Sequence, residues 1–169
     1  MRPTSPLPAH YFVVFTIYEP LLTFLGFFGA LLDPKGTYES QAPWLNGPPP
    51  EELQLATRLT ITQLGHVCAL LGLINIWLLT TARIHLNSQP ALQEKIVGAL
   101  LLPLLCGDVA HLVLSLYALG DQRWQYQNWS SMFIITFILG ISLLIPRIMW
   151  VMGIGRWTAR KQLQTKPAH

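Results

Sequence analysis

Residues 96–119 read IVGALLLPLLCGDVAHLVLSLYAL, a run with a single charged side chain, Asp108. As a helix, this run is long enough to cross the roughly 30 Å hydrocarbon core of a bilayer. One histidine, His111, follows the acid after one helical turn. The run therefore predicts a membrane span with a polar site near its middle.

Three further stretches share this apolar character. They are residues 11–32, 56–82 and 132–152. The connection 33–52 is rich in proline and is predicted to be a loop. The sequence thus predicts an all-α, integral-membrane four-helix bundle that forms one transmembrane domain over residues 1–169.

The composition also indicates a membrane protein. Of the 169 residues, 51% are hydrophobic and 11% are charged, and the mean hydropathy is +0.40. Soluble domains carry about 25% charged residues. The basic residues lie near the ends of the spans and form no arginine-rich patch, so no nucleic acid is expected as a partner.

Lysine and arginine are divided unequally between the two sides of such a bundle. Basic residues concentrate on the cytosolic side of membrane proteins. This bias predicts cytosolic N and C termini, with residues 156–169 as a basic cytosolic tail, in a multi-pass protein of the endoplasmic reticulum. The side of the termini carries Arg2, Arg83, Lys95, Arg156, Arg160, Lys161 and Lys166, whereas the opposite side carries Lys35, Arg58 and Arg123.

Ionisable side chains inside the spans are the candidate functional residues. An acid at the centre of a membrane helix costs about 2.5–3.5 kcal/mol on insertion scales. Glu19, Asp108 and His111 lie at similar depths and are expected to face one central cavity as catalytic residues. The alternative is a buried polar clasp that only orients the helices.

The second span offers two opposite polar faces. His66 and Asn75 lie about 180° apart on a regular helix. His66, with Gln63 beside it, is the favoured pocket face, and Asn75 is expected to act between helices. His66, Gln63, Asn75 and Trp124 are the candidate substrate-binding residues. Arg147 is close to the end of the fourth span, so its side chain is expected to extend to the interface as an anchor.

Two carboxyl groups in different apolar surroundings suit acid catalysis. A carboxyl group kept neutral by its surroundings can donate a proton, and a second carboxylate or a histidine can act as the base. The expected reaction is the acid-triggered opening of an epoxide on a lipophilic substrate that enters from the bilayer. The chain has no nucleotide, redox or metal-binding motif, so neither a cofactor nor a metal is expected.

Several short motifs stand out along the chain: Tyr18-Glu19-Pro20-Leu21, Gly107-Asp108-Val109-Ala110-His111-Leu112, Trp124, Asn128-Trp129 and an arginine at the end of the fourth span. Together they resemble a fungal family of small four-span membrane proteins, some encoded among genes for polyketide and terpenoid biosynthesis. A looser similarity links the chain to the fungal transmembrane terpene cyclases, which have seven spans, and to the EXPERA-type bundles. These proteins use acids inside a helical bundle to protonate an epoxide or an alkene, a role that the resemblance assigns to Glu19 and Asp108.

The expected function is therefore an integral-membrane enzyme of fungal secondary metabolism that hydrolyses or cyclises a polyketide or terpenoid epoxide. Its partners would be membrane lipid, a lipophilic small-molecule substrate and other biosynthetic enzymes. Two other classes stay open. One is a small membrane transporter, because small multidrug exporters also have four spans with a glutamate in the first. The other is a non-catalytic adaptor or lipid-binding protein.

Overall fold

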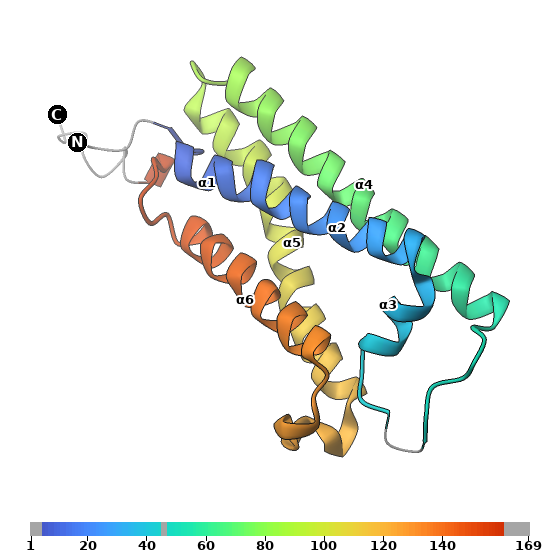
Figure 1. Ribbon diagram of the computed structural model, residues 1–169. Helices are drawn as coiled ribbons and strands as arrows, with labels where there is room; N and C mark the ends of the chain where they lie inside the picture. Colours follow the sequence, from blue (N-terminus) through green and yellow to red (C-terminus); the bar gives the residue numbers. More distant parts are fainter. Residues whose placement is uncertain (1–4, 45–46, 161–169) are drawn as a thin grey trace, which may run out of the picture.

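The computed structural model describes residues 5–44 and 47–160 and contains no β-strand in these ranges. Four long helical segments are apolar and long enough to cross a membrane, which confirms the predicted fold class (Figure 1). The first span combines α1 (Ala9–Val13), the π-helical segment η1 (Val14–Tyr18) and α2 (Glu19–Leu32). The other spans are α4 (Leu55–His85), α5 (Pro90–Ala118) and α6 (Ser131–Val151).

The connections hold more helix than the sequence predicted. A short helix, α3 (Pro34–Ser40), follows the first span inside the predicted loop 33–52. The Asp33 side chain accepts a hydrogen bond of 2.8 Å from the Gly36 N–H and caps this helix. Proline at the first helical position is also favourable, so Asp33-Pro34 starts a helix here. Two short 3-10 turns, η2 (Gly120–Trp124) and η3 (Tyr126–Asn128), lead into α6.

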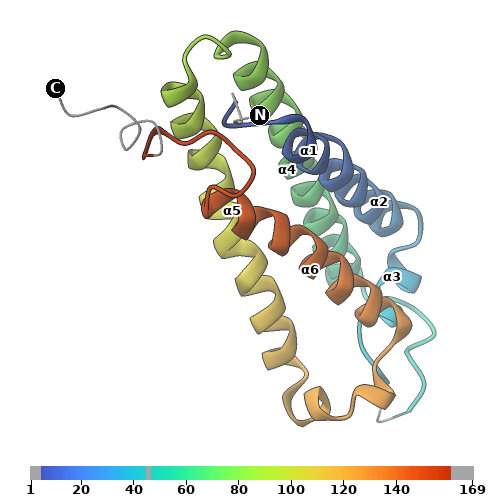
Figure 2. The same cartoon turned by 90° about the vertical axis from the view of Figure 1, so that its left-hand side faces the viewer.

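The first two spans pack closely along a stripe of small residues on α4. Figures 1 and 2 both show α4 alongside α1 and α2. Gly65, Ala69 and Gly72 are buried in this contact. A Cβ atom on Gly65 would lie 2.9 Å from the Cβ of Ala30, and one on Gly72 would lie 3.4 Å from the Cα of Pro20. Small residues at such spacing let two membrane helices approach closely.

Gly72→Val is expected to lower the free energy of unfolding by about 1–3 kcal/mol, because the added methyl groups overpack the contact with Pro20 and Thr23. Gly107→Val is the matched control, since no heavy atom lies within 4 Å of a Cβ built at Gly107. Its effect should stay within about 0.5 kcal/mol. Reversible unfolding in mixed micelles measures both values. Equal destabilisation by the two variants would contradict the close packing of these spans.

Both described ends of the chain meet at one end of the bundle. The Trp157 N–H donates to the Ser5 carbonyl oxygen at 3.1 Å, and the indole N–H of Trp150 donates to the Pro6 carbonyl oxygen at 2.9 Å. The Arg156 guanidinium lies 4.0 Å from the centre of the Trp150 ring and donates to Glu94 at 2.5 Å. These contacts close this end of the bundle. The cytosolic location of the ends remains a prediction.

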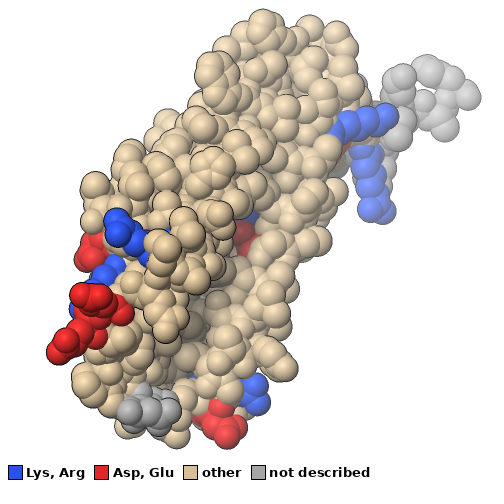
Figure 3. Space-filling view, turned by 90° about the vertical axis from the view of Figure 1, so that its right-hand side faces the viewer, with Lys and Arg blue, Asp and Glu red and all other residues tan. Residues whose placement is uncertain are grey.

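The surface between the two ends is apolar. In Figure 3, charged side chains gather towards the ends of the visible face, and one small acidic spot is recessed between them. Large hydrophobic side chains on the spans are exposed, among them Trp77 (71%) and Leu114 (62%). Such a surface is suited to contact with lipid acyl chains.

Candidate functional site

An arginine between two carboxylates lies in the interior of the bundle. The Arg147 side chain from α6 is fully buried. Its Nη2 atom donates to Glu19 Oε2 of the first span at 2.6 Å, and its Nη1 atom donates to Asp108 Oδ2 of α5. The expectation that Arg147 extends to the interface as an anchor is therefore wrong. Two acids on the facing helices provide stronger partners than the distant headgroups.

Pro20 and a π-helical turn shape the first span around Glu19. Proline has no N–H to donate and its ring crowds the carbonyl group one turn earlier. The Glu19 N–H donates instead to the Val14 carbonyl oxygen, five residues earlier, which widens the turn. Such π-turns within α-helices are frequent at functional sites. The Phe15 ring of this turn lies 5.5 Å from Arg147 Cζ and covers the guanidinium.

A second polar contact joins the first span to α6 close to the ion pairs. The Tyr18 and Ser142 hydroxyl groups share a hydrogen bond of 2.9 Å. Tyr18 directly precedes Glu19, and Ser142 precedes Arg147 by five positions along α6. Residues 18 and 19 therefore both connect the first span to the fourth.

Asn75 of the second span also lies in the interior. Each span therefore contributes one polar side chain there: Glu19, Asn75, Asp108 and Arg147. Asn75 is fully buried beside the Glu19 carboxyl group. Thr16 Oγ1 and Arg147 Nε are also buried, and neither atom has a hydrogen-bond partner among the described residues. Buried polar groups without partners are rare in proteins. This interior is therefore more polar than packing of the helices requires.

The prediction that His66 and Gln63 form the pocket-facing side of the second span is wrong. His66 and Gln63 are exposed on the outer surface, whereas Asn75 faces the interior. The physical reason is the small-residue stripe on α4, which turns the helix so that Gly72 and Asn75 meet the first span. Trp124 is also exposed, at 75%, in η2, where Arg123 Cζ lies 5.3 Å from its ring.

Asp108 is the more accessible of the two acids. Its side chain is 18% exposed, compared with 7% for Glu19. Asp108 Oδ1 accepts no hydrogen bond from any residue that the structure describes. This carboxyl group therefore combines a buried cation on one oxygen with a free second oxygen.

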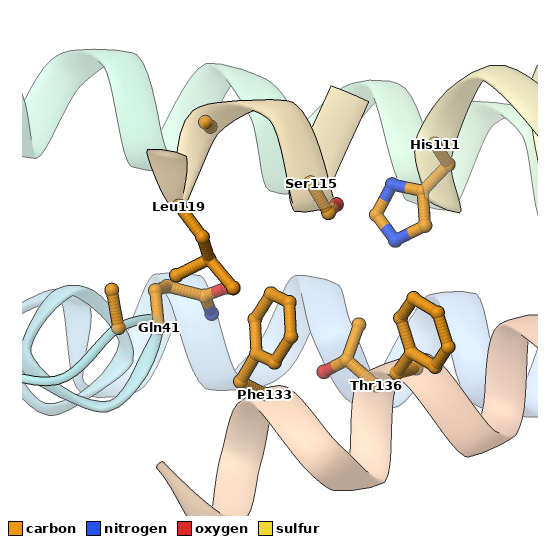
Figure 4. A pocket seen from close by; sticks show the side chains of 9 residues that line it. Gln41, His111, Ser115, Leu119, Phe133 and Thr136 are labelled. Atoms are coloured by element: carbon orange, nitrogen blue, oxygen red, sulfur yellow. The ribbon is translucent and has the colours of Figure 1, made fainter. Parts of the chain in front are cut away.

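A cleft begins one helical turn from Asp108. It has a volume of about 250 Å³ and lies between α5, α6 and the segment that follows α3. Figure 4 shows His111 and Ser115 on α5 opposite Phe133 and Thr136 on α6. Its full lining comprises Gln41, Ala42, His111, Ser115, Ala118, Leu119, Phe133, Thr136 and Phe137.

The prediction that Glu19, Asp108 and His111 face one central cavity is wrong, because the two acids are paired with Arg147 in the interior and the exposed His111 lines a separate cleft. Glu19 and Asp108 contact the same guanidinium, whereas His111 lines the cleft beside it. Neither Glu19 nor Asp108 is among the residues that line the cleft. No group of three or more His, Cys, Asp and Glu within residues 5–44 and 47–160 is arranged to hold a metal ion.

Arg147 is expected at the interface from the sequence alone, although the sequence carries a signal for its pairing with the acids. Arg147 lies within the fourth predicted span, five residues before its end. Two acids at bilayer depth need a compensating cation, and intramembrane charges pair with one another. Charge balance would therefore have assigned Arg147 to the acids.

Residues 4–156 match the model of a domain of unknown function, DUF7704. The chain belongs to the DUF7704 family. No curated protein and no solved structure matches the chain significantly. Glu19, Asp108, His111 and Arg147 all lie inside the matched region, so the candidate site is part of this DUF7704 domain.

Proposed function

We propose that this DUF7704 protein is a membrane enzyme that opens an epoxide on a lipophilic polyketide or terpenoid by hydrolysis or cyclisation. The observation that carries the proposal is Asp108, an accessible carboxyl group that is held by a buried arginine and lies one helical turn from His111, which lines an amphiphilic cleft. The cleft supplies a binding place beside the acid. The apolar surface of the spans suits a substrate that arrives through the bilayer.

The charge of the site supports a proton donor. Glu19, Asp108 and Arg147 together carry one negative charge when both acids are ionised. One added proton makes the cluster neutral, which is the favourable state in apolar surroundings. Asp108 can hold this proton on its free oxygen, and Arg147 can stabilise the carboxylate that remains after the proton is transferred.

The steps then follow from the positions of Asp108 and His111. The Asp108 carboxyl group donates its proton to the epoxide oxygen while one carbon–oxygen bond breaks. In hydrolysis, a water molecule adds to the carbon, and His111 accepts its proton and returns it to Asp108. In cyclisation, an internal hydroxyl group takes the place of the water. Glu19 is the less accessible of the two acids and acts by holding Arg147.

The proposal extends to the cellular setting. The resemblance to a fungal family encoded among biosynthetic genes supports a role in fungal secondary metabolism. We place the protein in the endoplasmic reticulum membrane with both termini cytosolic, where it would receive its substrate from other biosynthetic enzymes.

Deletion of the gene in its own host tests the proposal and also reveals the substrate. We expect an epoxide to accumulate, and the wild-type gene to restore the product while Asp108→Asn does not. Purified protein in detergent should convert the accumulated epoxide in ¹⁸O-labelled water. A diol with one ¹⁸O atom indicates hydrolysis, whereas an isomer without the label indicates cyclisation.

Three results would contradict the proposal. An unchanged metabolite profile would favour an adaptor or a lipid-binding protein. Accumulation of a compound without an epoxide would exclude this chemistry. Movement of the compound across vesicles under a gradient, with no chemical change, would indicate a transporter.

A further inference from the structure

The cleft beside Asp108 has a chemical character that defines its ligand. Its lining contains no lysine, arginine, aspartate or glutamate. A phosphate or diphosphate group would therefore find no cation in the cleft to pair with. The polar groups of the lining are the neutral amide of Gln41, the hydroxyl groups of Ser115 and Thr136, and the imidazole of His111.

His111 and Gln41 lie at the two ends of the cleft, and the side chains of Ser115 and Thr136 lie between them. Figure 4 shows His111 at one end and Gln41 beside Leu119 at the other, with Phe133 between them. His111 and Leu119 are eight positions apart on α5, which corresponds to about 12 Å along the helix. The His111 end adjoins Asp108, and the Gln41 end adjoins the connections between the spans.

We propose that the cleft binds an uncharged amphiphile with an apolar body and two oxygen functions about 12 Å apart. The epoxide lies at the His111 end. A hydroxyl or carbonyl group lies at the Gln41 end, where the amide can donate to or accept from it. The aromatic faces of Phe133 and Phe137 contact the body. The identity of the reacting group rests on the proposed function, whereas the neutral polar anchor rests on the lining of the cleft.

The size of the cleft supports this class of ligand. Pockets for drug-sized ligands measure roughly 300–1,000 Å³. The volume of about 250 Å³ suits the oxygenated part of a smaller isoprenoid or polyketide, and the rest of a longer molecule would extend into the bilayer. Epoxides of isoprenoid alcohols meet these requirements, whereas prenyl diphosphates do not.

Photoaffinity labelling tests the assignment independently of catalysis. The probe is a fifteen-carbon isoprenoid alcohol with a diazirine, added to the full chain in phosphatidylcholine nanodiscs. We expect the label on the peptide that holds residues 131–137. The unlabelled alcohol should compete at roughly 2–10-fold lower concentration than the matching hydrocarbon, the effect of one hydrogen bond. The matching phosphate should compete less well than the alcohol.

Variants connect the labelling to the cleft. Gln41→Leu should abolish the advantage of the alcohol over the hydrocarbon, and Ser115→Phe should fill the cleft and reduce labelling. Gln127→Leu is the matched control, because Gln127 is exposed outside the cleft. Equal competition by alcohol and hydrocarbon, stronger competition by the phosphate, or an unchanged result with Gln41→Leu would overturn the assignment.

The two proposals fail separately. Selective labelling by the alcohol without conversion of any accumulated epoxide would refute the enzyme and keep the assigned ligand class. Conversion of an epoxide without a preference for the alcohol would keep the enzyme and overturn the neutral anchor at Gln41.

Discussion

Replacing Arg147 with Met is expected to lower the free energy of unfolding by about 3–5 kcal/mol. The substitution keeps the apolar stem but leaves the carboxylates of Glu19 and Asp108 in the bundle without their cation. Removing one partner of a buried ion pair has a cost of this size, because the remaining charge is both desolvated and unpaired. Reversible unfolding in mixed micelles measures the change.

Two further variants make this result specific. Arg123→Met removes an exposed arginine from η2 and should change stability by less than about 0.5 kcal/mol. The triple variant Glu19→Gln, Asp108→Asn, Arg147→Met removes all three charges and should recover most of the lost stability. Equal effects of Arg147→Met and Arg123→Met would show that Arg147 is not the buried partner of the acids.

Asp108→Asn is expected to reduce the rate of epoxide opening by roughly 10²–10⁴-fold, the usual contribution of a general acid. The amide still accepts a hydrogen bond from Arg147 but has no acidic proton to donate. Because the variant leaves Arg147 paired with Glu19, the protein should remain folded. The measurement is single-turnover conversion of the accumulated epoxide in detergent.

Glu19→Gln separates the proton donor from the residue that holds the arginine. It removes the same charge, but from an acid whose side chain is less accessible than that of Asp108. We expect this variant to keep at least about a tenth of the wild-type rate, since the amide still accepts a hydrogen bond from Arg147 and a weakened hydrogen bond accounts for about 1 kcal/mol. Asp121→Asn, an exposed acid in η2, is the control for a general charge effect. A larger loss with Glu19→Gln than with Asp108→Asn would contradict the assigned roles.

The four spans could be predicted from the sequence because the length of an apolar run determines whether a helix can cross the bilayer. The largest difference in a boundary is at α5, which begins at Pro90 rather than at Ile96, because polar residues such as Gln93 and Glu94 continue the helix beyond the apolar run. Gln93 is buried there and donates to the Ala82 carbonyl oxygen at 2.8 Å. Helix 34–40 was missed because Asp33-Pro34 was interpreted as a break rather than as a cap.

The candidate site was predicted only in part. Glu19 and Asp108 stand out by their cost in the membrane, and the structure brings both to one partner. The identity of that partner depends on how α6 is rotated, which hydropathy does not determine. The orientation of α4 likewise depends on the fit of Gly65 and Gly72 against the first span, so the choice between His66 and Asn75 required three-dimensional packing.

The central claim, that Arg147 pairs with Glu19 across the interior of the bundle, is tested most directly by a double-mutant cycle. The free energies of unfolding of wild type, Glu19→Gln, Arg147→Met and the double variant give the coupling between the two side chains. We predict a favourable coupling of about 1–3 kcal/mol, as found for contacting charged residues. Additive effects, within about 0.5 kcal/mol, would contradict the pairing of Arg147 with Glu19.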